Sequence, residues 1–135
     1  MKINTYYHGG GNYDLFHNGV LWLTDSKEYA EDYALGNKPP VLYTITIDES
    51  QMKCCASSDY VDDAYGPSMS DIQAILNDGY NCYELVYEED DCFGIALLSK
   101  KPIIDIKREI IITEQDLHRI FRNSVNEVLN ENGHL

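Results

Sequence analysis

The chain has 135 residues, of which 44% are hydrophobic, and this is enough for one domain with a single core. It carries 23 acidic residues against 10 lysines and arginines, for a net charge of −13. Such a field repels nucleic acid and anionic membranes, so we expect neither as a direct partner. The sequence contains no apolar stretch of membrane-spanning length, and its N-terminal residues do not read as a signal peptide.

The excess negative charge lies in the first part of the chain. Residues 1–99 hold 17 Asp and Glu against 4 Lys, whereas residues 100–135 hold 6 acidic and 6 basic residues. An acidic field of this kind steers a protein toward a basic partner, but acidity also serves solubility alone. Charge by itself leaves both interpretations open.

The four cysteines form no Cys-x-x-Cys pair and have no histidines at zinc-ligand spacing, so no metal site is predicted. They are Cys54, Cys55, Cys82 and Cys92. This usage is typical of a reduced, intracellular protein whose thiols are free, and we therefore expect a cytoplasmic location.

Alternating and apolar runs predict a series of short strands. The expected strands are Ile3–Tyr7, Val20–Leu23, Val41–Ile47, Cys82–Val86, Phe93–Leu98 and a region within Pro102–Ile112. Polar residues 49–69 between them are expected to form a long surface excursion.

Two helices are predicted between these strands. Tyr29, Ala30, Tyr33 and Ala34 fall on one helical face, and Asp25 with Glu28 has the spacing of a capping box. The second, short helix covers Asp71–Leu76. Because long helices between the strands are missing, the order indicates an α+β fold with mostly antiparallel strands.

A separate amphipathic helix is expected after Thr113, which has Asp116 at capping-box spacing. Its apolar stripe consists of Leu117, Ile120, Phe121, Val125, Val128 and Leu129. We therefore divide the chain into a domain of residues 1–112 and a C-terminal helix within residues 113–135. This helix either packs on the sheet, which is the default for such a stripe, or serves for docking to a partner or a second copy.

Three segments carry the functional signal: Tyr7-His8-Gly9, then Leu21-Trp22-Leu23-Thr24-Asp25, then Tyr29-Ala30-Glu31-Asp32-Tyr33-Ala34. Together they resemble the ADP-ribosyltransferases, in particular the diphtheria-toxin type and the small transferase domains of phages and mobile elements. The resemblance covers residues 5 to 106 and includes the later Gly79-Tyr80 turn. It implies a split antiparallel sheet with short helices, and NAD as the substrate.

The resemblance also implies roles for single residues. His8 would hold the adenine-side ribose hydroxyls, and the backbone of Gly9 would hydrogen-bond the nicotinamide carboxamide. Trp22 and Tyr33 would sandwich the nicotinamide ring, while Thr24 would support the floor of the pocket. Each also has a structural interpretation, because a strand-end histidine or an apolar-face aromatic usually belongs to the core. Tyr29 is expected to be the core residue of the two helical tyrosines.

The catalytic acid is the least determined part of the pattern. ADP-ribosyltransferases usually place a glutamate at the start of a late strand, but here that strand begins Cys92-Phe93-Gly94-Ile95. Some phage members that inhibit CRISPR immunity resemble this chain in placing an acid earlier. On that pattern Glu89 is the first candidate, followed by Glu88 or Asp91, with Glu84 as a lesser one. A solvated acidic turn is the alternative.

These motifs favour an NAD-dependent mono-ADP-ribosyltransferase that modifies a basic host protein in the bacterial cytoplasm, encoded by a phage or mobile element and directed at a host defence system. An NAD glycohydrolase would share the same site. The alternative from another class is a non-enzymatic acidic inhibitor on a degenerate ADP-ribosyltransferase fold. It would cover the basic surface of a nucleic-acid-binding protein.

Overall fold

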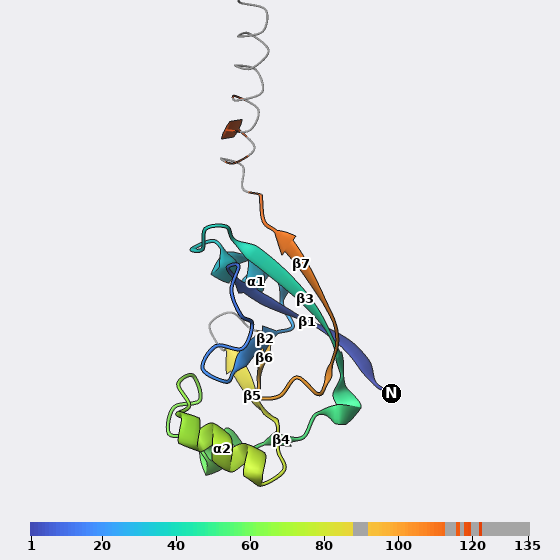
Figure 1. The fold of residues 1–135 in the computed structure, drawn as a ribbon, viewed down its shortest axis with the longest axis vertical. Helices are drawn as coiled ribbons and strands as arrows, with labels where there is room; N and C mark the ends of the chain where they lie inside the picture. The colour runs from blue at the N-terminus through green and yellow to red at the C-terminus, as the bar shows by residue number, and fades with distance from the viewer. Residues whose placement is uncertain (88–91, 113–115, 117, 120–121, 123–135) are drawn as a thin grey trace, which may run out of the picture.

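A seven-stranded sheet is the framework of the computed structural model, which describes residues 1–87, 92–112, 116, 118, 119 and 122 (Figure 1). In chain order the elements are β1 (Ile3–Gly10), β2 (Leu21–Thr24), α1 (Lys27–Ala34), β3 (Val41–Asp48), η1 (Glu49–Gln51), β4 (Cys54–Cys55), η2 (Ser57–Asp59), α2 (Met69–Asn77), β5 (Cys82–Tyr87), β6 (Cys92–Leu97) and β7 (Ile103–Ile110). The elements η1 and η2 are single 3-10 turns. The α+β class predicted from the sequence is confirmed.

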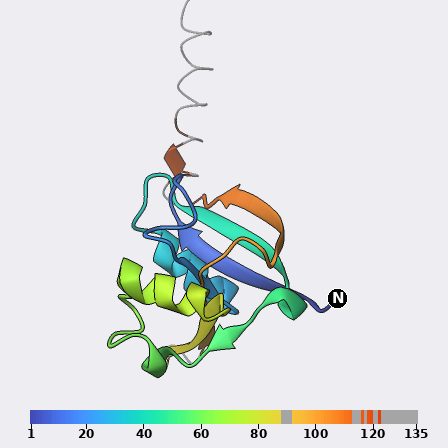
Figure 2. The same ribbon diagram turned by 60° about the horizontal axis from the view of Figure 1, so that its bottom comes forward.

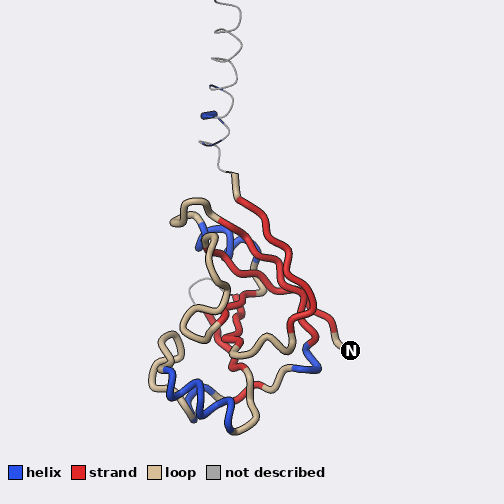
Figure 3. The backbone as a smooth tube through the Cα atoms, in the orientation of Figure 1, coloured by secondary structure: helices blue, strands red, loops and turns tan. Residues whose placement is uncertain are grey.

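The sheet has the order β4-β5-β6-β2-β1-β3-β7, and it is mixed because β4 and β5 run parallel. All other neighbouring strands are antiparallel. β1 pairs with β3 over its whole length, but it meets β2 at one residue pair, Tyr7 with Thr24. The sheet therefore consists of two halves, β1-β3-β7 and β4-β5-β6-β2, and the long strands of the first half run side by side in Figure 3.

Successive side chains of a strand point to opposite faces of the sheet, and the apolar ones form one hydrophobic cluster on each face. The first contains Tyr6, Leu21, Leu23, Val41, Tyr43, Ile45, Ile47, Cys82, Ile95 and Leu97. The second contains Val20, Val61, Ile72, Ile75, Tyr83, Leu85, Ala96 and Leu98. Because Ile72 and Ile75 come from α2, this helix covers the β5 end of the sheet, away from β7 (Figures 1 and 2).

Helix α1 packs directly on β1 because Gly9 has no side chain. A Cβ at this position would lie about 1.7 Å from the carbonyl oxygen of Ala30. The sequence pattern predicts a strand that ends at Tyr7, but β1 continues through Gly9 and Gly10, whose partners in β3 are Leu42 and Val41. The glycines therefore extend the strand beneath the helix.

The capping of both helices follows from short polar side chains. Ser26, and not Asp25 as predicted, caps α1, since its hydroxyl accepts the Tyr29 N–H at 3.1 Å. The Asp25 carboxylate accepts the N–H of Phe93 at 3.0 Å and so ties the end of β2 to β6. Helix α2 begins two residues earlier than predicted, behind a capping box formed by Ser68 and Asp71.

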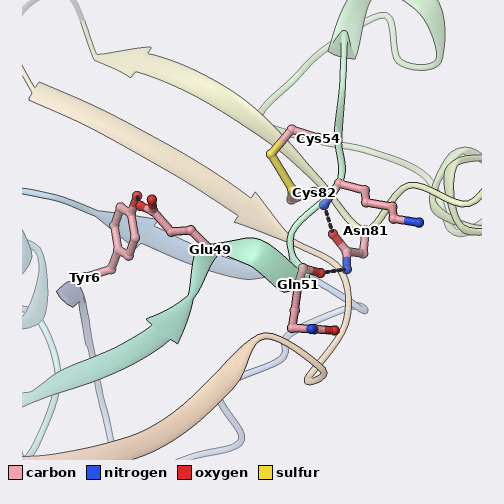
Figure 4. The surroundings of a disulfide bond; sticks show 7 residues. Tyr6, Glu49, Gln51, Cys54, Asn81 and Cys82 are labelled. Atoms are coloured by element: carbon pink, nitrogen blue, oxygen red, sulfur yellow. Dashed lines mark hydrogen bonds between the residues drawn. A yellow bond between two sulfur atoms is a disulfide. The ribbon is translucent and has the colours of Figure 1, made fainter. Parts of the chain in front are cut away.

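Residues 49–69 are more ordered than the predicted surface excursion, because they contain η1, β4 and η2. Cys54 forms a disulfide with Cys82, so the expectation of free thiols is wrong for these two residues (Figure 4). They are 28 positions apart, and the β4–β5 pairing brings their Cα atoms to 4.5 Å. Since disulfides are rare in the cytosol, the cysteines no longer support the predicted cytoplasmic location.

A second link holds β4 beside β5. The Asn81 side-chain oxygen accepts the Lys53 N–H at 2.8 Å, and its amide nitrogen donates to the Gln51 carbonyl at 3.0 Å (Figure 4). The two-residue strand β4 is therefore fixed by both hydrogen bonds and the disulfide.

The apolar stripe predicted for the C-terminal helix lies outside the described residues, and so does its division from the rest of the chain at residue 113. Within the described part of the chain, none of the helices has the length and apolar character needed to cross a membrane.

The Gly9 contact predicts a position-specific loss of stability. Gly9→Ala should lower the free energy of unfolding by about 1–3 kcal/mol, because the new Cβ displaces α1 from β1. Urea unfolding followed by circular dichroism measures the effect. Gly36→Ala is the matched control, since a Cβ there meets no atom within 4 Å. Equal midpoints for the two variants would contradict the assigned packing.

Because the Cys54–Cys82 disulfide restricts the unfolded chain, we expect a reductant to destabilise the protein. For a separation of 28 residues, opening the bond should cost about 3–4 kcal/mol of unfolding free energy. Urea unfolding with and without a reductant gives the difference, and alkylation followed by mass spectrometry identifies the cysteines that react. Unchanged unfolding after complete alkylation of Cys54 and Cys82 would refute the stabilising role.

Candidate functional site

A cleft of about 200 Å³ opens where the two halves of the sheet separate. Its walls come from β1, β2, α1 and the segment between η2 and α2. The lining residues are Tyr7, His8, Gly9, Trp22, Leu23, Thr24, Tyr29, Ala30, Tyr33 and Tyr65. All five residues predicted to bind the dinucleotide, His8, Gly9, Trp22, Thr24 and Tyr33, are therefore brought together in one cleft.

His8 lines this cleft and has a buried hydrogen-bond acceptor, Nε2. Its Nδ1 lies 2.7 Å from the carbonyl oxygen of Trp22. A carbonyl only accepts, so Nδ1 carries the proton and donates. Burial lowers the pKa of His8, and this outweighs the hydrogen bond to Trp22. The ring is therefore neutral near pH 7, and its Nε2 carries a lone pair that has no hydrogen-bond partner among the described residues.

Aromatic rings form the walls of the cleft. Tyr33 is 67% exposed, and its ring stacks on that of Tyr29, with centroids 6.5 Å apart and planes at 27°. Trp22 is half-buried and also packs against the second core cluster, so it serves the core and the cleft together. Tyr29 is half-buried, so it is the more core-like of the two helical tyrosines, as predicted, and it also lines the cleft.

Tyr65 is the lining residue that the sequence analysis missed. It is 57% exposed and comes from the polar segment 49–69, where no hydrophobic pattern marks it. The buried Tyr83 of β5 places it, since the Tyr83 hydroxyl donates to the carbonyl of the neighbouring Ala64 at 2.6 Å. The Tyr65 hydroxyl lies 3.5 Å from the carbonyl oxygen of Val86.

Thr24 and Gly9 shape the floor of the cleft. The buried Thr24 hydroxyl accepts the N–H of Ser26 at 3.1 Å and fixes the turn from β2 into α1. Gly9 lines the cleft, but its missing Cβ accommodates Ala30 of α1. Its glycine character is thus explained by helix packing, and a contact with the nicotinamide carboxamide stays a prediction.

A side hollow of about 490 Å³ adjoins the cleft and shares three of its walls, His8, Trp22 and Tyr33. Its other lining residues are Tyr13, Asp14, Leu15, Phe16 and His17. Clefts that enclose a drug-sized ligand measure roughly 300–1,000 Å³, so the cleft alone fits one ring system rather than a dinucleotide. Together with the side hollow it accommodates a ligand of two parts.

The three leading candidates for the catalytic acid, Glu88, Glu89 and Asp91, lie outside the described residues. The strand ends on either side of them are next to the cleft: the Val86 carbonyl faces Tyr65, and Phe93 binds Asp25 beside Thr24.

The described carboxylates lie outside the cleft itself. Glu84 lines a separate hollow of about 310 Å³ that also contains Lys2, Tyr6 and Glu49. Among the described lining residues of the cleft there is no carboxylate, and in the side hollow Asp14 is the one found.

Comparison with known proteins gave no match, whether to protein-family models, to curated proteins or to solved structures. The function is therefore inferred from the geometry of the cleft and from the motifs that line it.

The buried, neutral state of His8 predicts a pH-dependent stability. Because its pKa is lowered in the folded state, the unfolded state binds more protons below about pH 6.5, and stability should fall as the pH drops through this range. Unfolding free energies at neutral and mildly acidic pH measure the slope. His8→Gln should flatten it, and an NMR titration should show the His8 ring protonating below the normal value. A His8 resonance with an ordinary or raised pKa would refute the assignment.

Proposed function

We propose that the protein is an NAD-dependent mono-ADP-ribosyltransferase with its active site in the cleft. One observation carries the proposal: residues chosen from three separate motifs, His8 and Gly9, Trp22 and Thr24, and Tyr33, line a single cavity. Scattered core residues would not share such a cavity. The cleft lies at the junction of two half-sheets, in agreement with the split sheet that the resemblance implies.

The hydrogen-bond acceptor atom of His8, Nε2, has no partner among the described residues, and this favours a sugar as the ligand. A buried polar atom without a partner costs free energy, and a ligand hydroxyl relieves that cost by donating to Nε2. The ribose hydroxyls of NAD are donors of this kind. We therefore assign His8 to the adenine-side ribose of NAD, as the resemblance implies.

The aromatic walls of the cleft favour the binding of a flat ring, which in NAD is the nicotinamide. Trp22 and Tyr33 border both the cleft and the side hollow, and Tyr29 and Tyr65 add further aromatic surface to the cleft. Aromatic side chains bind flat rings through stacked and edge contacts. We assign the nicotinamide to the cleft and the ADP part to the side hollow.

In the proposed reaction, a nucleophilic group of the acceptor protein forms a bond to C1′ of the nicotinamide ribose. The glycosidic bond to nicotinamide breaks, and nicotinamide leaves with the electron pair and becomes neutral. A carboxylate stabilises the positive charge that develops on the ribose and takes the proton of the acceptor. We assign this role to Glu89, with Glu88 and Asp91 as the next candidates.

The acceptor of the ADP-ribosyl group is proposed to be a basic host protein. The net charge of −13 repels nucleic acid and attracts a positively charged surface. A nucleic-acid-binding protein of a bacterial defence system has such a surface, and a phage or mobile element is the source that fits this target. The place of action is then the cytoplasm of the host cell, where the Cys54–Cys82 disulfide would have to persist under reducing conditions.

A second candidate function is that of a non-enzymatic inhibitor, which would cover the basic surface of the same kind of partner. It is favoured by the lack of a carboxylate among the described residues that line the cleft, together with the acidic charge. Such a protein would bind its partner without consuming NAD.

The proposal predicts NAD-dependent labelling of a host protein. Purified protein is incubated with labelled NAD and a lysate of the bacterial host, and we expect one labelled band. His8→Ala and Tyr33→Ala should reduce labelling by at least about tenfold, and Glu89→Ala by about 100-fold, since loss of one charge-stabilising group costs on the order of 10²–10³ in rate. Tyr80→Ala is the matched control, because this exposed tyrosine lies outside the cleft.

The outcomes separate the candidates. Release of nicotinamide without a labelled band indicates hydrolysis of NAD. No turnover combined with salt-sensitive binding to a basic protein supports the inhibitor and refutes the transferase. Labelling that survives in His8→Ala would contradict the site assignment.

A further inference from the structure

Strand β7 leaves one long edge of the sheet open. It comprises eight residues and ends the strand order, whereas the strand at the other edge, β4, has two. In Figure 1 β7 lies along the outside of β3. An exposed strand of this length presents a row of backbone N–H and C=O groups to which another strand can pair.

The side chains of β7 are apolar where the core of the sheet continues onto it. Ile106 pairs with Ile45, and Ile110 pairs with Val41. Paired residues share a face of the sheet, and both residues of β3 are fully buried. Ile106 and Ile110 nevertheless remain 43% and 57% exposed, because no described element covers them on the open side.

We propose that β7 pairs antiparallel with β7 of a second copy of this chain, about a two-fold axis at Arg108. In an antiparallel ladder, a residue whose side chain lies on one face of the sheet pairs with a residue whose side chain lies on the same face. Two copies of one strand therefore pair residues whose numbers are both even or both odd. This rule leaves few registers to compare.

The register centred on Arg108 matches both the apolar and the charged side chains. Ile106 of each copy faces Ile110 of the other, which joins the apolar faces of the two sheets. Lys107 of each copy faces Glu109 of the other, and this gives two pairs of opposite charge. Within one chain Lys107 Nζ already lies 3.3 Å from Glu109 Oε1, and the two side chains are 70% and 51% exposed, so pairing of two copies joins two such ion pairs into one network of alternating charge.

Neighbouring registers are less favourable. An axis at Lys107 sets that lysine against its own copy and places Asp105 opposite Glu109. An axis at Ile106 also sets each Lys107 opposite an acid, Asp105, but it leaves Glu109 opposite Ile103 and Arg108 opposite Ile104. In the favoured register one like-charge pair remains, Arg108 with its copy, and long arginine side chains can extend from the axis into water. Lysines on an edge strand normally discourage pairing, but here Glu109 compensates each Lys107.

Sedimentation velocity of the full chain over a wide range of protein concentration tests the proposal. We expect a reversible dimer. K107E and E109K each replace two attractive pairs by two repulsive ones and should raise the dimer dissociation constant by about tenfold. The double variant K107E/E109K restores opposite charges in reversed order and should return the constant to within about threefold of the original.

K101E is the matched control, because it makes the same change in net charge at an exposed lysine outside β7. Circular dichroism establishes that each variant is folded. A protein that stays monomeric at all concentrations overturns the proposal. A dimer that K107E weakens no more than K101E, or that the double variant fails to restore, also overturns it, since another surface would then form the contact.

Discussion

The hydrogen bond from the His8 ring to the Trp22 carbonyl is the interaction on which the site depends. It joins β1 to β2 immediately beyond Tyr7 and Thr24, where the pairing of the two strands ends. The same bond fixes which ring nitrogen carries the proton, and so it directs a lone pair toward the interior. This one hydrogen bond thus links the two half-sheets beside the cleft, and it also determines which nitrogen of His8 can accept a hydrogen bond.

The surroundings of this hydrogen bond explain why the His8 ring is neutral. Leu21, Leu23 and Ile95 bury the sheet on one side, and α1 covers β1 on the other through Gly9. In such an apolar setting the protonated imidazole is disfavoured, which agrees with the lowered pKa of His8. An uncharged acceptor suits a sugar hydroxyl better than it suits a phosphate.

Much of this arrangement could be predicted from local sequence patterns. The strands other than β4, and α1, could be predicted because alternation and helical periodicity are local signals, and the five cleft residues lie in the short motifs that carry the family resemblance. The Cys54–Cys82 bond and the position of Tyr65 were missed, since both depend on how residues 49–69 fold back on β5. Ser26 displaced Asp25 as the cap because the Asp25 carboxylate is engaged by Phe93, a contact 68 positions away along the chain.

The close approach of Gly9 and Ala30 has a consequence for how this cleft can change during evolution. Position 9 is confined to glycine, because a Cβ there would overlap the backbone carbonyl of Ala30. A substitution at this position would therefore impair folding before any effect on ligand preference could matter. Changes of ligand preference that leave folding intact are then expected on the outer side of the cleft, where the exposed Tyr65 lies on a loop.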